Sequence, residues 1–124
     1  MKRHPALQPL SREHHAALKL AKACERAVAA GQADETCRRA VAVFATELEP
    51  HFRVEERELL PLLDDAGQQG LAERTLAEHA GLRALAVELR QCCDAGVLQR
   101  FGAQLAAHVR FEERELFPAL ETLL

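Results

Sequence analysis

The chain carries one eleven-residue motif twice, and the motif contains the side chains best able to do chemistry. The first copy is residues 51–61 (HFRVEERELLP) and the second is residues 108–118 (HVRFEERELFP), with eight of the eleven positions identical. Each copy places a histidine four residues before a glutamate. Four residues turn an α-helix by about 400°, so the two side chains share one helix face. Imidazole and carboxylate on two such faces predict a two-metal site between helices.

Two further histidines complete the candidate site. The pairs Glu13-His14 and Glu78-His79 look alike, and each precedes one copy of the motif. This pattern indicates a duplicated helix pair, in which each half supplies one histidine and then a His-x-x-x-Glu sequence. Folded antiparallel, the halves would place two His-His-Glu sets around one axis. The predicted metal ligands are His14, His51, Glu55, His79, His108 and Glu112.

The first helix offers two adjacent histidines, His14 and His15, which lie about 100° apart around the helix axis. His14 shares its side with an apolar stripe, whereas His15 shares its side with basic residues such as Lys19. The apolar stripe should face the core, which favours His14. Against this choice, residues 15–19 (HAALK) resemble residues 79–83 (HAGLR), which would make His15 the counterpart of the second half's histidine.

A purely structural interpretation competes with the metal site, because one His-x-x-x-Glu on a helix is usually a surface pair worth tenths of a kcal/mol. The helix face argues against it, since Leu48 and Leu62 share the stripe of His51 and Glu55. Burying a carboxylate beside a histidine costs several kcal/mol unless something compensates. A metal ion is the strongest such compensator.

The remaining glutamates of the motif are weaker candidates for metal ligands. Glu56 and Glu113 point away from the ligand face of a regular helix, so we expect them to be solvated. Glu58 and Glu115 fall one further turn along the ligand face. They could be additional ligands, partners of the ligand histidines, or exposed charges, and the last two roles are favoured.

Four helical segments must position these residues, after an irregular N-terminal arm. We expect the arm to span residues 1–10 and a single domain to span residues 11–124. The helical segments should run over residues 11–30, about 34–64, about 71–93 and from about 97 to the C-terminus. Short connections make consecutive helices antiparallel neighbours. The sequence therefore predicts an all-α fold, an antiparallel up-down-up-down four-helix bundle.

Local signals mark the ends of these segments. Ser11 is a plausible N-cap for the first segment and Gly31 should end it, while Asp34 could cap the second. Pro50 lies inside the second segment and should kink it, and Pro118 should kink or end the fourth.

Composition narrows the class of protein. The 124 residues are 48% hydrophobic and 28% charged, with many Ala and Leu and few Gly and Pro, as in all-helical domains. A net charge of −3 leaves no basic footprint for nucleic acid. No apolar run approaches the roughly 18 residues of a membrane span. The first ten residues lack an apolar signal core, so we expect a cytoplasmic protein without nucleic-acid or membrane partners.

The cysteines show neither metal-type CxxC spacing nor a disulfide framework. They are Cys24, Cys37, Cys92 and Cys93. We expect reduced thiols in a cytosolic protein, with redox sensing by the adjacent Cys92 and Cys93 as the alternative.

With these residues in view, the chain resembles a known family over nearly its whole length. It is similar to the hemerythrin-like proteins with the His-His-Glu (HHE) cation-binding domain, most specifically in His51-Phe52-x-x-Glu55-Glu56. The resemblance implies an antiparallel four-helix bundle that holds a non-haem di-iron centre. In the family, one histidine of the first helix and the histidine of the second bind one iron.

Residue by residue, the resemblance implies His14 and His51 on one iron and His79 and His108 on the other. Glu55 and Glu112 fall where the family's bridging carboxylates lie, beside an oxo or hydroxo bridge.

Two departures separate this chain from the oxygen-carrying hemerythrins. The carriers have a fifth histidine one turn before the position of His79, where this chain has Thr75. They also use an Asp five residues after the last histidine, where this chain has Glu112 four residues after His108. In both respects the chain resembles the broader bacterial subgroup of the family. The ferritin-like Glu-x-x-His pattern is absent, which disfavours that family.

The ligand types agree with two iron ions, and manganese or zinc would also suit imidazole and carboxylate. Two histidines per metal leave positions open for water, dioxygen, peroxide or nitric oxide. The chain contains no Tyr or Trp, which excludes a stored tyrosyl or tryptophanyl radical.

Three functions are compatible with these residues. The favoured hypothesis is a di-iron protein that binds dioxygen, nitric oxide or iron for sensing, delivery or storage. The alternative is a di-iron enzyme that decomposes peroxide or reduces nitric oxide. The third is a helical interaction domain with a polar core and no metal.

Overall fold

A computed structural model describes residues 2–124, and every regular element among them is helical, which confirms the predicted all-α class. The chain forms four rods, two of which are interrupted by π-helical segments. The elements are α1 (Gln8–Ala29), α2 (Ala33–Val43), η1 (Phe44–Leu48), α3 (Glu49–Val54), η2 (Glu55–Leu59), α4 (Leu60–Asp65), α5 (Gln69–Gln91), α6 (Ala95–Phe111), η3 (Glu112–Leu116) and α7 (Phe117–Glu121).

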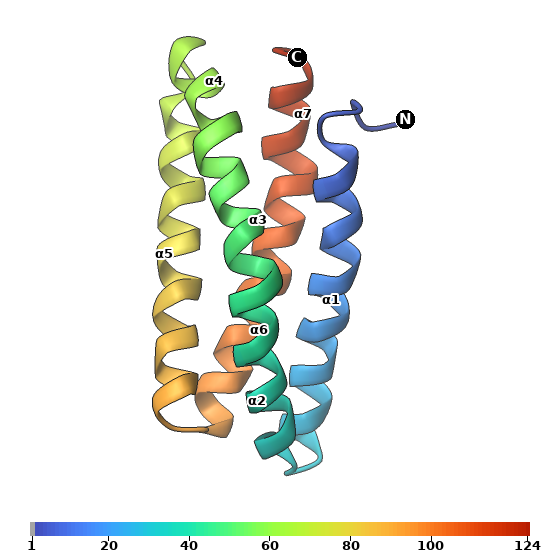
Figure 1. Cartoon of the computed structure of the whole chain (residues 1–124), viewed down its shortest axis with the longest axis vertical. Coiled ribbons are helices and arrows are strands. Elements are labelled where there is room, and N and C mark those ends of the chain that lie inside the picture. Colours follow the sequence, from blue (N-terminus) through green and yellow to red (C-terminus); the bar gives the residue numbers. More distant parts are fainter. Residues whose placement is uncertain (1) are drawn as a thin grey trace.

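Figure 1 shows the four rods side by side, with consecutive rods running in opposite directions and both termini at the same end. The first half of the chain supplies α1 and the α2–α4 rod, and the second half supplies α5 and the α6–α7 rod. α1 packs along α6, and α5 packs along α6 and against α2 and α4. Residues from all four rods can therefore meet on the bundle axis.

Two of the predicted helix caps differ in the structure, and one helix end agrees. α1 begins at Gln8, with Pro9 in its first turn, so Ser11 lies inside the helix rather than at its N-cap. Asp34 lies in the first turn of α2 without capping it. Gly31 does end the first rod, in a left-handed conformation with φ of 69° that glycine adopts without steric cost.

Each π-helical segment ends two residues before a proline. The N–H groups of Glu49, Leu60 and Phe117 donate to the carbonyls five residues earlier, and the next residue in each case is a proline. Proline has no N–H to donate, and its ring crowds the carbonyl four residues before it. The turn in front of it widens from α to π geometry, which is where such bulges arise. A wide turn therefore precedes each proline that lies inside a rod.

Two of these wide turns begin at the glutamates of the repeated motif. The segments η2 and η3 have the same sequence, EEREL, and start at Glu55 and Glu112. A wider turn changes the angle between successive side chains, so that Glu55 and Glu56 both face neighbouring rods. The same holds for Glu112 and Glu113. The wide turns thus give each motif two inward carboxylates instead of one.

The core has two apolar clusters with a polar layer between them. One cluster contains Phe44, Phe52, Leu98 and Phe101, and the other contains Leu7, Leu63, Leu116 and Phe117. Leu7, which precedes α1, is fully buried in the second cluster. The buried histidines and glutamates lie between these clusters, so apolar side chains shield them from water at both ends.

Two of the four cysteines form a disulfide, and the expectation of reduced thiols is wrong for them. Cys37 in α2 is bonded to Cys93, which follows α5, across a sequence separation of 56 residues. Cys24 is a buried free thiol and Cys92 an exposed one. Helix packing rather than sequence spacing brings the bonded pair together, so spacing gave no sign of it.

None of the helices that the structure describes combines the length and the apolar character that crossing a membrane requires.

Candidate metal centre

The structure brings all six predicted ligand residues together in the polar layer. Each is at least 95% buried, and among residues 2–124 Thr75 is the only other buried polar residue. Thr75 donates its hydroxyl to the Leu71 carbonyl and so takes no part in the cluster. His14 lies in the cluster, whereas His15 is exposed.

Glu112 lies at the centre of the four imidazoles. Its Oε1 is 2.8 Å from His14 Nε2, and its Oε2 is 2.9 Å from His108 Nε2. His51 Nε2 and His79 Nε2 each lie 3.6 Å from one of its oxygens. The side chain is completely buried.

Glu55 is equally buried but contacts only two of the imidazoles. His51 Nε2 is 3.1 Å from Glu55 Oε2, and His79 Nε2 is 3.0 Å from Glu55 Oε1. All four histidines therefore direct Nε2 at the two carboxylates.

The donors form two sets that share both glutamates. One set is His14, His51, Glu55 and Glu112, and the other is Glu55, His79, His108 and Glu112. In each set, the four ligand atoms lie within 4.8 Å of one another. Two cations bridged by two carboxylates would need this arrangement of donors.

Four buried atoms of the cluster lack a hydrogen-bond partner in the described residues. They are Glu55 Oε1, His79 Nε2, His108 Nε2 and Glu112 Oε2. These atoms approach one another closely, but without the angles of a hydrogen bond. Buried polar atoms are almost always satisfied, and leaving one unpaired costs about 1–3 kcal/mol. The donor set therefore fits a pair of cations better than a closed hydrogen-bond network.

A glutamate holds the other ring nitrogen of each of the four clustered histidines. Nδ1 of His14, His51, His79 and His108 lies 2.6, 2.7, 2.7 and 2.6 Å from carboxylates of Glu113, Glu13, Glu56 and Glu78, respectively. An ionised carboxylate only accepts, so each Nδ1 carries a proton. That leaves each Nε2 as the nitrogen that can bind a metal, and the carboxylate fixes the plane of the ring.

The outer glutamates follow the same pattern in both halves. Glu13 and Glu78 hold the histidine of the next rod in the same half, whereas Glu56 and Glu113 hold a histidine of the other half. The expectation that Glu56 and Glu113 are solvated is wrong, because the wide turns bring them inward. For Glu13 and Glu78, the signal in the sequence was that each directly precedes a histidine, in the matching pairs Glu13-His14 and Glu78-His79. Glu58 and Glu115 are exposed, as one of the alternatives proposed.

Charge within the cluster changes the pKa of its members. Burial disfavours the imidazolium of His51, but hydrogen bonds and charges from Glu112 and Glu55 raise its pKa to about 11. The same balance raises the pKa of His79 to about 9. Burial would raise the pKa of Glu112, but hydrogen bonds from all four histidines hold it well below its ordinary value. Burial and repulsion by Glu112 raise the pKa of Glu55.

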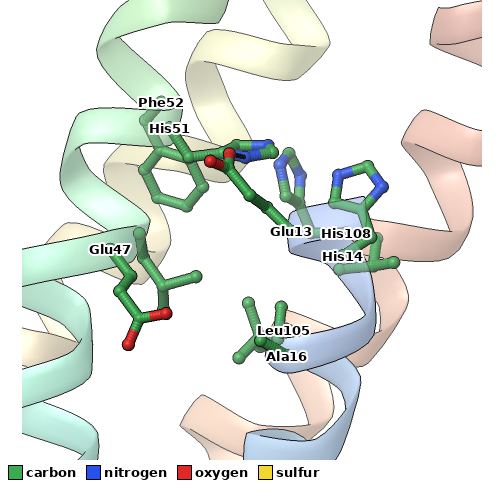
Figure 2. A pocket seen from close by; sticks show the side chains of 11 residues that line it. Glu13, His14, Ala16, Glu47, His51, Phe52, Leu105 and His108 are labelled. Carbon is green, nitrogen blue, oxygen red and sulfur yellow. Dashed lines mark hydrogen bonds and ion pairs between the residues drawn. The ribbon is translucent and has the colours of Figure 1, made fainter. Parts of the chain in front are cut away.

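A cavity of about 20 Å³, about the size of one water molecule, lies beside the cluster. Figure 2 shows the imidazoles of His14, His51 and His108 on one side of it, with Ala16 and Leu105 across from them. Glu13 also lines the cavity. A small molecule could therefore lie next to the donor set in a mostly apolar space.

The comparisons with known proteins agree with this donor set. The family model described as the hemerythrin HHE cation-binding domain matches residues 6–120. No curated protein and no solved structure matched the chain. The match covers all four rods, so the family model and the clustered side chains concern the same unit.

Proposed function

This chain belongs to the hemerythrin family of HHE cation-binding domains, and we propose that it holds a pair of iron ions on the bundle axis. His14 and His51 would bind one ion, and His79 and His108 the other. Glu55 and Glu112 would bridge the two ions, beside an oxo or hydroxo group. The observation that carries this proposal is the convergence of four Nε2 atoms on two fully buried carboxylates, with four buried atoms left unpaired.

The donor chemistry supports iron and is compatible with manganese or zinc. When bound, a metal pair with two histidines per ion supplies open coordination positions for dioxygen, nitric oxide or peroxide. The protein's own residues keep each imidazole in one tautomer through the outer glutamates. The apolar clusters on both sides exclude water from the site.

We propose that the centre binds dioxygen, nitric oxide or iron itself, for sensing, delivery or storage. The small apolar cavity beside His14 and His51 supports a diatomic ligand. The absence of Tyr and Trp from the chain argues against demanding oxidations, because no aromatic side chain can store a phenoxyl or indolyl radical.

A second candidate is a di-iron enzyme that decomposes peroxide or reduces nitric oxide. One observation favours it: Glu13 lines the cavity, hydrogen-bonds to His51 at 2.7 Å, and has a side chain that is 57% exposed. Nitric oxide reduction consumes protons, and peroxide decomposition moves protons between two peroxide molecules, so a carboxylate at this position could relay protons in either reaction.

Metal analysis tests the proposed centre directly. We expect about two iron ions per chain after iron-replete expression without chelators, and anomalous scattering at the iron edge should locate both between the six ligand residues. Glu55→Ala and Glu112→Ala should lower the metal content, whereas Glu58→Ala and Glu115→Ala, exposed positions of the same motif, should not. A wild-type protein that retains no metal contradicts the proposal.

Rapid mixing separates the two candidate roles. A binding protein in the di-ferrous state should change its visible spectrum on mixing with dioxygen or nitric oxide and recover when the gas is removed. An enzyme should evolve oxygen from peroxide, or consume nitric oxide in the presence of an added reductant, faster than free iron does. Loss of that turnover in Glu13→Ala, with metal content unchanged, would favour the enzyme.

The expected cytoplasmic location remains part of this proposal. The Cys37–Cys93 bond weighs against it, because disulfides are rare in reducing compartments. Alkylation of free thiols in intact cells, followed by mass spectrometry, would show whether this pair is reduced in the cell.

A further inference from the structure

Each half clamps an outer glutamate of the other half with an arginine, and the two arginines come from unrelated places in the sequence. In the second half, Arg83 of α5 donates from Nη1 to Glu56 Oε2 at 2.9 Å and from Nη2 to Glu56 Oε1 at 3.2 Å. Glu56 in turn holds His79 Nδ1. The arginine therefore fixes both oxygens of the carboxylate that orients this histidine.

In the first half, the clamp comes from the segment before α1. Arg3 donates from Nε and Nη2 to Glu113 Oε1, at 3.3 and 3.2 Å, and from Nη2 to the Glu113 carbonyl at 2.5 Å. Glu113 holds His14 Nδ1 and also accepts the Ser11 hydroxyl at 2.6 Å. Arg3 thus stands in the same relation to His14 as Arg83 does to His79.

A phenylalanine completes each clamp. The Phe52 ring is stacked on His79 at 3.9 Å, and the Arg83 guanidinium lies 5.7 Å from the centre of that phenylalanine ring. The Phe117 ring is stacked on His14 at 5.2 Å, and the Arg3 guanidinium lies 5.8 Å from its centre. Each arginine therefore contacts its histidine's carboxylate and its histidine's aromatic neighbour.

The repeated sequence does not explain this correspondence. Arg83 lies four residues after His79, and the residue four after His14 is Leu18, which cannot clamp a carboxylate. Phe52 directly follows the motif's histidine, whereas the second copy has Val109 there. The first half reaches the same arrangement through the arm, whose Leu7 is anchored in the apolar core.

We propose that Arg3 is a positioning residue for the metal site of His14 and His51, which makes the N-terminal arm part of the metal centre. It acts through Glu113, whose fixed carboxylate holds the plane of the His14 ring and aims Nε2 at the metal position. This inference rests on the proposed two-metal function and deepens it. The guanidinium is only partly buried, so its effect should appear in metal binding rather than in overall stability.

Cobalt release tests this role. Purified protein loaded with two Co²⁺ ions is mixed with excess EDTA, and the loss of the cobalt absorption is followed in wild type, Arg3→Met and Arg83→Met. We expect each variant to release one of its two ions about tenfold faster, the lower end of the range for residues that support a metal ligand. His14→Ala and His79→Ala identify which release phase belongs to which site.

Glu121→Gln is the matched control. Arg3 also pairs with Glu121, and that contact ties the arm to α7 without touching His14. This variant should release cobalt at the wild-type rate, and Arg3→Lys should lie between wild type and Arg3→Met. Equal acceleration in Glu121→Gln and Arg3→Met would reduce Arg3 to an anchor for the arm and overturn the proposal. So would a wild-type rate in Arg3→Met together with acceleration in Arg83→Met.

A spectroscopic readout complements the rates. In the Co²⁺-loaded protein, each ligand histidine should give one strongly shifted Nδ1–H proton resonance. The resonance that disappears in His14→Ala belongs to His14. Arg3→Met should broaden that resonance through faster exchange with water and leave the His79 resonance sharp. An unchanged His14 resonance would overturn the proposal, whereas a wild-type chain that binds no cobalt would contradict the two-metal function itself.

Discussion

Glu55 and Glu112 begin segments of identical sequence, yet their surroundings differ. Glu112 Oε1 and Oε2 lie within 3.6 Å of all four imidazoles, whereas Glu55 contacts only His51 and His79. The pKa of Glu112 is held well below its ordinary value, and that of Glu55 is raised by burial and by Glu112. A repeated sequence therefore repeats the local turn but not the electrostatic environment.

The difference has a physical cause in the metal-free cluster. Two carboxylates close together in an apolar core repel each other, and the protons of four imidazoles can favour one of them over the other. Two cations placed between the carboxylates would neutralise both in the same way. We therefore expect the asymmetry to belong to the metal-free protein and to disappear on loading.

Metal loading should produce the largest change in stability. A cation that binds only the folded chain adds about 4 kcal/mol to the free energy of unfolding at 1,000 times its dissociation constant, so two ions would add about 8 kcal/mol. That corresponds to a rise in melting temperature of roughly 20 °C or more. Calorimetry of the same preparation with and without iron checks this. Equal melting temperatures would mean that iron does not bind preferentially to the folded chain.

The disulfide joins the two halves covalently, at the end of the bundle where α2 begins and α5 ends. Closing a loop of 56 residues should stabilise the fold by up to about 4 kcal/mol through the unfolded state. Cys37→Ser together with Cys93→Ser should lose most of this in urea denaturation. The exposed Cys92→Ser is the control and should change little. A full loss in that control would mean that the bridge involves Cys92 instead.

Replacing Glu55 and Glu112 one at a time tests the asymmetry itself. In the metal-free protein, Glu112→Gln removes the charge that faces four imidazoles and should destabilise the fold by about 3 kcal/mol, as breaking a buried ion pair does. Glu55→Gln removes a repelled charge and should cost about 1 kcal/mol or less. Urea denaturation of both variants gives the comparison.

The loaded protein provides the reverse outcome. With metal bound, the two substitutions should cost similar amounts, because both remove a bridging ligand. If the two substitutions also destabilise the metal-free protein by similar amounts, the two carboxylates are equivalent there. That result would contradict the asymmetry between Glu55 and Glu112.

The parts of this site that the sequence predicted are those set by regular helix geometry. The four-residue spacing placed His51 and Glu55 on one face, and the apolar stripe of the first helix favoured His14 over His15. Both sets of side chains converge in the structure, while their role as ligands stays a prediction. These predictions depend only on the spacing of residues within one or two turns of a regular helix.

The rest depends on departures from regular helices or on distant parts of the chain. Regular α geometry turned Glu56 away from the core, but the wide turn in front of Pro61 brings it to His79. Arg3 reaches Glu113 across 110 residues, which no periodic pattern encodes. Ser11 has the residue type of a helix cap, but the helix begins at Gln8, with Pro9 in its first turn. Proline-induced turns and contacts of the arm are therefore the information that spacing alone lacks.

The pH dependence of the metal-free protein should distinguish the histidines of the two halves. In the folded chain the pKa of His79 is raised to about 9 and that of His51 to about 11, both above the value of about 6.5 in an unfolded chain. Their protonated forms therefore stabilise the fold fully below about pH 6.5, and this stabilisation is lost as the pH rises through each folded pKa. From pH 7 up to the folded pKa of each histidine, the free energy of unfolding should fall by about 1.4 kcal/mol per pH unit for that histidine. Ring-proton NMR shifts should show His79 losing its proton before His51, and the reverse order, or two midpoints near pH 6.5, would show that the carboxylates do not favour the first half's imidazole.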